Sequence, residues 1–236
     1  MNPPPFVVCV PAAGGGKRFG GALPKQFIEI RGVPVLALTL SVFQGIPECT
    51  RIILAVNDRK RVENIIRRYA LTKVDAIVNG GPRRQDSAAA MLPLCGDDET
   101  VVLFHDAVRP CVNPAHVRAV ARAVQEVGAA LLALHARDTI KRAQGGRVLT
   151  TLDRSEIWLA QTPQGARAGL WRKAFDTAER DGYCGTDDVE LLERLGIEVA
   201  LVPGDAANIK ITTPEDIALV DAVLGQRQRA TETPGK

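Results

Sequence analysis

The stretch Phe6-Val-Val-Cys-Val10 runs straight into Pro11-Ala-Ala-Gly-Gly-Gly-Lys-Arg18. Its short apolar run is rich in valine, which favours a buried β-strand. The glycine-rich segment that follows predicts a loop at the carboxyl end of this strand. In open α/β sheets, ligands bind at that end of the strands. The start of the chain therefore indicates both an α/β fold and the position of a binding site.

The alternation of apolar runs and amphipathic stretches continues along the chain. Further strands are expected at residues 51–56, 74–78, 100–105, 129–134 and 197–202. Helices are expected at residues 34–45, 59–70, 84–94, 114–127, 167–181, 187–195 and 214–224. Strands that alternate with helices of this length are joined by right-handed crossovers and form a mostly parallel sheet. The predicted fold is a Rossmann-like α/β sheet with helices on both faces.

Composition excludes several classes of protein. The 236 residues are 46% hydrophobic, enough to bury a core, and favour one domain over residues 1–225. A formal charge of +3 without a Lys/Arg block argues against a nucleic-acid binder. There is no signal-type N-terminus and no run of 18 apolar residues, so we expect a cytoplasmic chain without membrane contact. Five scattered cysteines exclude disulfides and zinc as organising features. The polar tail, residues 226–236, is expected to be disordered.

Residues 137–156 break the rhythm of strands and helices. Gly145-Gly146 lies between two β-capable arms, which predicts a hairpin. The arms are too charged to lie inside the sheet, so the hairpin should project from the body. It is either a solvated surface hairpin or an arm that contacts a second subunit.

The first loop combines glycines with three cations. Successive N–H groups of such a loop form an anion-binding nest, and Lys17, Arg18 and Lys25 can neutralise phosphates. This pattern suits a triphosphate, although a purely structural turn is the alternative. Arg18 follows Lys17 where a Walker loop needs Ser or Thr, and Phe19 replaces the third glycine of the dinucleotide fingerprint. These two departures argue against a kinase, an ATPase or a dehydrogenase as the function of this chain.

Two more loops follow predicted strands. Asn79-Gly80-Gly81 with Ser87 suits close contact with a flat base, or is an ordinary turn with an N-cap. In His105-Asp106-Ala107-Val108-Arg109-Pro110, the carboxylate can hold Mg²⁺ or a sugar hydroxyl, and Arg109 can clamp a phosphate. The alternative is a local Asp106–Arg109 ion pair. His105 is expected to be a packed, hydrogen-bonded residue.

The fourth candidate segment is Asn208-Ile-Lys210, which is expected to form a short strand that feeds the last helix. Pro214 favours the start of that helix, and Thr213 is its expected cap. Lys210 presents a cation from the strand. A lysine on its own is usually an ordinary surface residue, so Lys210 is a candidate site residue only in combination with the other motifs.

These motifs occur together and in one order. They are Pro11-Ala-Ala-Gly14, Pro24-Lys-Gln26, Gly80-Gly81 with Ser87, His105-Asp-Ala-x-Arg-Pro110, Asp138-Thr139 with Lys141, Asp153-Arg154, Gln161-Thr-Pro-Gln164, Thr186-Asp187 and Asn208-Ile-Lys210. From about Val7 to Leu224, the chain resembles the 2-C-methyl-D-erythritol 4-phosphate cytidylyltransferase family of the non-mevalonate isoprenoid pathway. The joint pattern is far more specific than any one of its members.

The resemblance implies a sheet of the nucleotide-diphospho-sugar transferase type and a set of site residues. Those implied to hold CTP are Ala12, Ala13, Gly14, Gly15, Gly16, Lys25, Gly80, Gly81, Ser87, Asp106 and Ala107. Those implied to bind the acceptor, methylerythritol phosphate, are Asp106, Arg109, Thr139, Arg154, Thr162 and Lys210. The implied catalytic residues are Arg18, Lys25, Arg154 and Lys210, and Asp106 is the implied ligand of Mg²⁺. Thr139 and Arg154 would be delivered by the hairpin of a partner in a homodimer.

The implied reaction moves CMP from CTP to the acceptor and releases pyrophosphate. A phosphate monoester is largely ionised at neutral pH, so its attack on the α-phosphorus needs positioning more than a general base. Two positions depart from the commonest family pattern, Pro82 and Val108. Because proline has no N–H, Pro82 offers no backbone donor to a base.

Two other functions stay open at this point. One is a cytidylyltransferase for another polyol phosphate, such as ribitol 5-phosphate, on the same scaffold. The other is a nucleotide-binding regulator that has lost its chemistry. Such a regulator would be expected to lack Arg18, Lys25 or Lys210, and all three are present.

Overall fold

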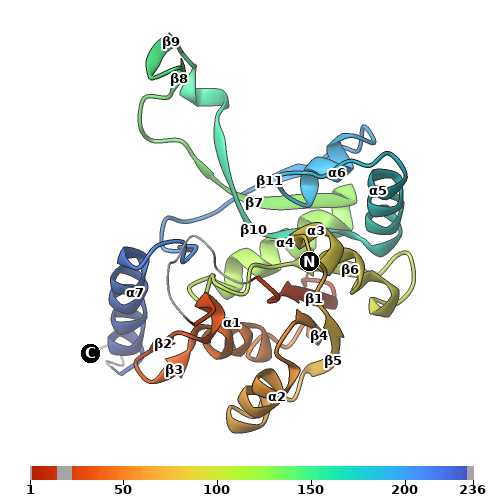
Figure 1. Cartoon of the computed structure of the whole chain (residues 1–236), viewed down its shortest axis with the longest axis vertical. Coiled ribbons are helices and arrows are strands. Elements are labelled where there is room, and N and C mark those ends of the chain that lie inside the picture. The colour runs from red at the N-terminus through yellow and green to blue at the C-terminus, as the bar shows by residue number, and fades with distance from the viewer. Residues whose placement is uncertain (1, 15–22, 233–236) are drawn as a thin grey trace.

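The computed structural model describes residues 2–14 and 23–232. Seven strands form its central sheet: β1 (Phe6–Pro11), β4 (Cys49–Val56), β5 (Val74–Asn79), β6 (Val101–Phe104), β7 (Ala129–His135), β10 (Trp158–Arg167) and β11 (Ala200–Pro203). Their order is β11-β7-β10-β6-β1-β4-β5 (Figure 1). Only β10 pairs antiparallel with its neighbours, β6 and β7, among these strands. The predicted mostly parallel sheet is confirmed.

Helices pack on both faces of the sheet. They are α1 (Val35–Gln44), α2 (Arg59–Arg68), α3 (Arg84–Ala89), α4 (Pro114–Val127), α5 (Ala168–Arg180), α6 (Val189–Glu193) and α7 (Glu215–Glu232). The helix expected at 84–94 is divided into α3 and a single 3₁₀ turn at Leu92–Leu94, where Pro93 lacks the N–H that a continuous helix needs. None of the helices in the described ranges has the apolar length that a membrane crossing requires.

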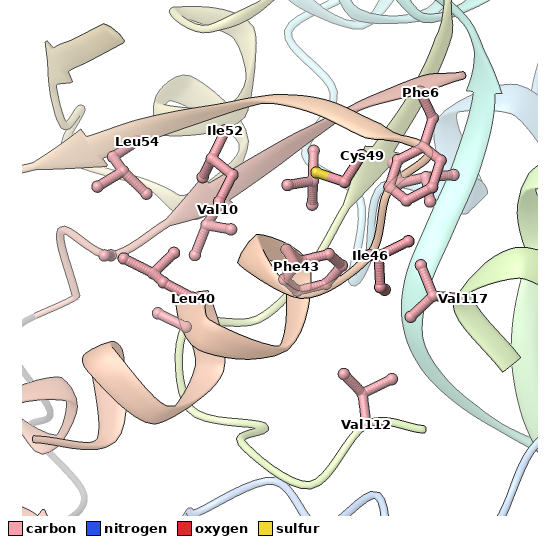
Figure 2. Close-up of a cluster of buried hydrophobic side chains, with 14 of the residues drawn as sticks. Phe6, Val10, Leu40, Phe43, Ile46, Cys49, Ile52, Leu54, Val112 and Val117 are labelled. Carbon is pink, nitrogen blue, oxygen red and sulfur yellow. The ribbon is translucent and has the colours of Figure 1, made fainter. Parts of the chain in front are cut away.

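The alternation of side chains along β1 builds a core on each face. Phe6 and Val10 lie on the same side of the sheet as Leu40 and Phe43 of α1, and all four are buried (Figure 2). Val7 and Cys9 of β1 point to the opposite face, where they belong to a second buried cluster with residues of helices α3, α5 and α6. The strand is therefore buried on both sides, as its continuous apolar sequence predicts.

The central strand β10 is absent from the sequence-based prediction. Its middle, Gln161-Thr-Pro-Gln-Gly165, is polar, so no apolar run marks it as a strand. The two glutamines are nevertheless buried, because Gln161 donates to the Asp205 carbonyl and Gln164 accepts from the backbone of α6. Specific partners make polar side chains compatible with the interior of a sheet.

The short strand expected around Lys210 is wrong. Residues 208–212 lie in an irregular segment beside the sheet. Asn208 is buried there, and its amide donates to the Thr162 carbonyl at 2.9 Å and to Gln161 Oε1 at 3.1 Å. Side-chain hydrogen bonds hold this segment in place of a strand ladder.

The expected disorder of the tail is wrong for residues 226–232, because α7 continues through Glu232. The helix is held by residues that lie outside the tail in the sequence. Arg31 pairs with Asp221 at 2.5 Å and donates to Gln228 at 2.6 Å, and Arg227 donates to the Cys111 carbonyl at 2.8 Å. Residues 233–236 lie outside the described part of the chain. Arg31 lies between the short strands β2 (Glu29–Ile30) and β3 (Val33–Pro34).

The predicted hairpin is present and projects from the body (Figure 1). Its strands are β8 (Lys141–Gln144) and β9 (Arg147–Thr151), which pair antiparallel. Gly145 and Gly146 have positive φ angles of 56° and 74°, which glycine adopts readily. Val148 and Leu149 are 64% and 53% exposed on this arm, so its apolar side chains have little cover within one chain.

Candidate active site

A pocket of about 510 Å³ opens beyond the carboxyl ends of β1, β4, β5 and β6. It gathers three of the loops that the sequence singled out. The predicted nucleotide-binding residues that line it are Ala12, Ala13, Gly14, Lys25, Gly81, Ser87, Asp106 and Ala107. Pro82 and Val108, the two positions that depart from the family pattern, also line it. The carboxyl edge of the parallel strands is therefore where these side chains meet.

The loop after β1 is held by side chains from outside it. Gln26 donates to the Ala12 carbonyl at 2.7 Å and to the Gly14 carbonyl at 3.2 Å. Asn57, directly after β4, donates to the Ala13 carbonyl at 2.8 Å. These bonds restrain successive carbonyl groups of the loop. Gly15, Gly16 and Arg18, three further predicted site residues, lie outside the described residues.

The loop after β5 is shaped by close packing and internal hydrogen bonds. A Cβ atom added to Gly80 would lie 2.0 Å from Ala13 Cβ, so glycine is required where the two loops touch. Gly80 packs against the first loop, whereas Gly81 lines the pocket. Ser87 Oγ accepts from the Gly81 N–H at 3.0 Å and donates to the Arg83 carbonyl at 3.2 Å. The loop is thus a hydrogen-bonded turn, as the alternative interpretation expected, and Gly81 and Ser87 of this turn also line the pocket.

Asp106 is the most strongly paired carboxylate of the pocket. It is 6% exposed, and its Oδ2 lies 3.0 Å from both Arg109 Nε and Lys210 Nζ. Its Oδ1 lies 3.6 Å from Arg84 NH2. Burial alone would raise the pKa of this carboxyl, but the three cations outweigh it and hold the pKa well below its usual range. Asp106 therefore stays ionised, and the predicted local ion pair with Arg109 is part of a larger network.

Thr162 and His105 support Asp106 from behind. Thr162 Oγ1 accepts from the Asp106 N–H at 3.1 Å and lies 3.0 Å from His105 Nδ1. His105 Nε2 lies 3.2 Å from the Arg109 carbonyl, so this network is satisfied by a neutral ring that carries its proton on Nε2. Burial lowers the pKa of His105 to about 4. The expectation of a packed, hydrogen-bonded histidine is confirmed.

Two lysines of the predicted site are joined through one segment. Lys25 Nζ donates to the Ile211 carbonyl at 3.0 Å, next to Lys210 in the sequence. Arg109 NH1 donates to the Asn208 carbonyl at 2.7 Å. The irregular segment at 208–212 therefore connects the first loop with the Asp106 motif.

Arg84 and Asp188 belong to this network and were missed in the sequence. Arg84, at the start of α3, lines the pocket, and its NH1 lies 2.6 Å from Asp188 Oδ2 at the start of α6. Asp188 is 1% exposed. No spacing pattern links the two residues, because their contact depends on how the helices pack.

The two arm residues of the predicted site lie apart from these side chains. Thr139 and Arg154 are exposed on the hairpin, and Arg154 donates to the Arg137 carbonyl at 2.6 Å within the arm. Within the described part of the chain, no residue of the arm lines the pocket. A single chain thus brings together the described residues of the predicted site without its two arm residues.

The pocket offers limited means to hold a metal ion. Among the described residues there is no cluster of three or more His, Cys, Asp and Glu side chains. Mg²⁺ in phosphate-transfer sites commonly uses one or two carboxylates, with substrate phosphates and water as its other ligands. Asp106 Oδ1, with Arg84 at 3.6 Å as its cation partner, is a suitable single carboxylate oxygen. The residues fit a Mg²⁺ ion that arrives with a triphosphate.

Comparisons with known proteins agree on one family. Its model, "2-C-methyl-D-erythritol 4-phosphate cytidylyltransferase" (IspD), matches residues 6–226. A relative of that name from Geobacillus kaustophilus is 43% identical over 224 residues, covering 94% of this chain and 98% of the relative. Another, from Syntrophus aciditrophicus, is 43% identical over 229 residues, covering 95% and 98%.

Solved structures give the same result. The 4-diphosphocytidyl-2C-methyl-D-erythritol synthase of Anaerococcus prevotii has a TM-score of 0.81 at 28% identity, covering 94% of this chain and 96% of that one. The 2-C-methyl-D-erythritol 4-phosphate cytidylyltransferase of Thermus thermophilus has a TM-score of 0.76 at 32% identity, covering 93% and 98%. This chain belongs to the 2-C-methyl-D-erythritol 4-phosphate cytidylyltransferase family.

Proposed function

We propose that this chain is a cytidylyltransferase that moves CMP from CTP to 2-C-methyl-D-erythritol 4-phosphate. The products are 4-diphosphocytidyl-2-C-methyl-D-erythritol and pyrophosphate. The observation that carries this proposal is the convergence of the Ala12–Gly14 loop, the Gly81–Ser87 loop and the Asp106 motif on one pocket, in a chain of this family.

The chemistry follows from charge and position. An oxygen of the acceptor phosphate attacks the α-phosphorus of CTP in line, and the bond from that phosphorus to the bridging oxygen of pyrophosphate breaks. Arg18 and Lys25 stabilise the negative charge that grows in the transition state. The attacking phosphate is already ionised, so no general base is required. His105 is fully buried and both of its ring nitrogens have partners, so it is not available to take a proton from the substrate, which agrees with this assignment.

The acceptor is assigned to the surroundings of Asp106, where Arg109 and Lys210 lie beside the residues that line the pocket. Both pair with Asp106 Oδ2, so an arriving phosphate exchanges one anionic partner of these cations for another. Lys210 is the more accessible of the two, with 44% of its side chain exposed. This exposure favours Lys210 as the cation that meets the acceptor phosphate first.

Mg²⁺ is part of the proposal, with Asp106 as its protein ligand. When bound, the ion supplies positive charge to the triphosphate and to the leaving pyrophosphate. The support is Asp106, the carboxylate among the described residues that line the pocket, whose pKa is held below its usual range by nearby cations. Substrate phosphates and water would supply the remaining ligands.

The site is completed in a homodimer. The projecting arm of each subunit delivers Thr139 and Arg154 to the site of the other subunit. Two observations support this arrangement. Both residues are exposed on an arm that leaves the body, and Val148 and Leu149 expose apolar surface on the same arm. Exposed apolar side chains that gather in one place mark contact surfaces.

A cytoplasmic location completes the proposal. The five cysteines are all thiols, although the sulfur atoms of Cys9 and Cys95 lie 3.4 Å apart. Proteins of reducing compartments keep such thiols unpaired.

The test is pyrophosphate release with each of four nucleotides and a panel of polyol phosphates that includes ribitol 5-phosphate. We expect CTP to be preferred, because a close site built for cytosine leaves polar groups unpaired with the wrong base. Turnover should require 2-C-methyl-D-erythritol 4-phosphate as the acceptor. Equal rates with ATP would refute the base assignment, and faster turnover with ribitol 5-phosphate would reassign the acceptor.

A further inference from the structure

Arg84 lies between two carboxylates, one in the pocket lining and one outside it. Its NH1 is 2.6 Å from Asp188 Oδ2, and its NH2 is 3.6 Å from Asp106 Oδ1. The first is a close ion pair, and the second exceeds the length of a regular hydrogen bond. Arg84 is therefore held by Asp188, which lies outside the pocket lining, and is kept just out of bonding range of Asp106, which lines it.

Asp188 is fixed in the protein. Its backbone N–H, like that of Val189, donates to Gln164 Oε1 at 3.2 Å, which anchors the start of α6 to β10. The side chain is buried, and burial raises the pKa of this carboxyl. In the described part of the chain, no regular hydrogen bond reaches Asp188 Oδ2. The ion pair with Arg84 is thus the interaction that compensates this buried oxygen.

The two oxygens of Asp106 are consequently unlike. Oδ2 receives Arg109 and Lys210 at 3.0 Å each, whereas among the described residues the ion-pair partner of Oδ1 is the more distant Arg84. Arginine and carboxylate prefer a close pair with two parallel hydrogen bonds. Without Asp188, Arg84 would close onto Asp106 and occupy Oδ1.

We propose that Asp188 is a positioning residue of the nucleotide site, which holds Arg84 back so that Asp106 Oδ1 stays available to bound CTP. This inference rests on the proposed function. The available oxygen can accept from a ribose hydroxyl or bind the metal ion that accompanies the triphosphate. Asp188 acts through Arg84 and does not touch the substrate.

The central test is Asp188→Asn, which removes the charge and keeps the size of the side chain. We expect the dissociation constant of CTP, measured by calorimetry without acceptor, to rise by about tenfold, the range of coupling between neighbouring charged residues. The KM for CTP should rise in parallel, while the KM for the acceptor changes less than about twofold. Glu48→Gln is the matched control, because it removes the carboxylate partner of half-buried Arg118 at the opposite edge of the sheet. It should leave both constants unchanged.

A double variant separates positioning from mere stabilisation. Once Arg84 is replaced by Gln, Asp188 has nothing to hold, so Arg84→Gln and Arg84→Gln/Asp188→Asn should bind CTP equally. This pair decides the matter even if Asp188→Asn alone fails to fold. An equal loss of CTP affinity from Asp188→Asn with and without Arg84 would overturn the inference, as would an unchanged CTP constant in the folded single variant. If the unaltered chain itself fails to bind CTP, the proposed function is overturned first, and this inference with it.

Discussion

Lys210 Nζ lies 3.0 Å from Asp106 Oδ2, and this ion pair joins the motif after β6 to the irregular segment that precedes α7. The neighbouring Ile211 carbonyl accepts from Lys25, so one segment touches both sides of the proposed reaction. A cation near each phosphate group is what an in-line transfer between two polyanions requires.

The first prediction concerns the triphosphate. Lys25→Ala and Arg18→Ala should each lower kcat by roughly 10² to 10³, the usual loss when one preorganised charge donor is removed from a transition state. Lys60→Ala, which removes an exposed lysine at the start of α2, should leave kcat unchanged. The measurement is pyrophosphate release, with circular dichroism as the check on folding. A fall of less than about fivefold in a folded variant would show that the residue does not stabilise the transition state in this way.

The second prediction concerns the acceptor. Lys210→Ala and Arg109→Ala should mainly raise the KM for the acceptor phosphate, because each removes a cation that pairs with Asp106, where the acceptor is proposed to bind. Arg109→Ala should also lower the free energy of unfolding by about 1–3 kcal/mol, since Asp106 and the Asn208 carbonyl lose a buried partner. Steady-state kinetics and urea denaturation measure the two effects. A rise confined to the KM for CTP would contradict this division.

The third prediction is a pH dependence of stability. The pKa of His105 is about 4 in the folded chain against 6.5 for an ordinary histidine, so the unfolded state takes up the proton first as pH falls. Stability is therefore fully present above about pH 6.5 and declines between about pH 6.5 and 4, by up to about 1.4 kcal/mol per unit of pH.

The comparison that isolates this effect is His105→Gln, whose amide can accept from Thr162 and donate to the Arg109 carbonyl without titrating. Urea denaturation at several pH values, without nucleotide or metal, gives the slope for each protein. The variant should show a shallower decline over this window. Identical slopes would mean that His105 is not the group responsible.

The fourth prediction concerns the arm. If each site combines the body of one subunit with the arm of the other, Lys25→Ala damages the body and Arg154→Ala damages the arm. In a mixed dimer one site then carries both defects and the other carries none. Random pairing makes half the dimers mixed, so refolding equal amounts together should recover about a quarter of the unaltered activity.

Each variant refolded alone is the control for this complementation. Tags of different size on the two variants report whether mixed dimers have formed. Mixed dimers without recovered activity would mean that the arm serves its own subunit.

Much of the architecture can be predicted from the sequence because it follows from local pattern. The apolar run Phe6–Val10 predicts a strand buried on both faces, and β1 is one. Gly145-Gly146 between charged arms predicts a projecting hairpin, because glycine adopts the positive φ angles of its turn. The loops around Gly14, Gly81 and Asp106 meet at one pocket because the carboxyl ends of parallel strands share one edge of the sheet.

Tertiary structure alone decided the elements whose stability comes from distant partners. The polar strand β10 lies inside the sheet because Gln161 and Gln164 find partners near β11 and α6. Helix α7 extends through Glu232 with support from Arg31, far away in the sequence. The hold of Asp188 on Arg84 depends on two separate helices packing on the same face. Sequence periodicity reports which side of an element is buried, whereas an ion pair depends on which elements the crossovers bring together.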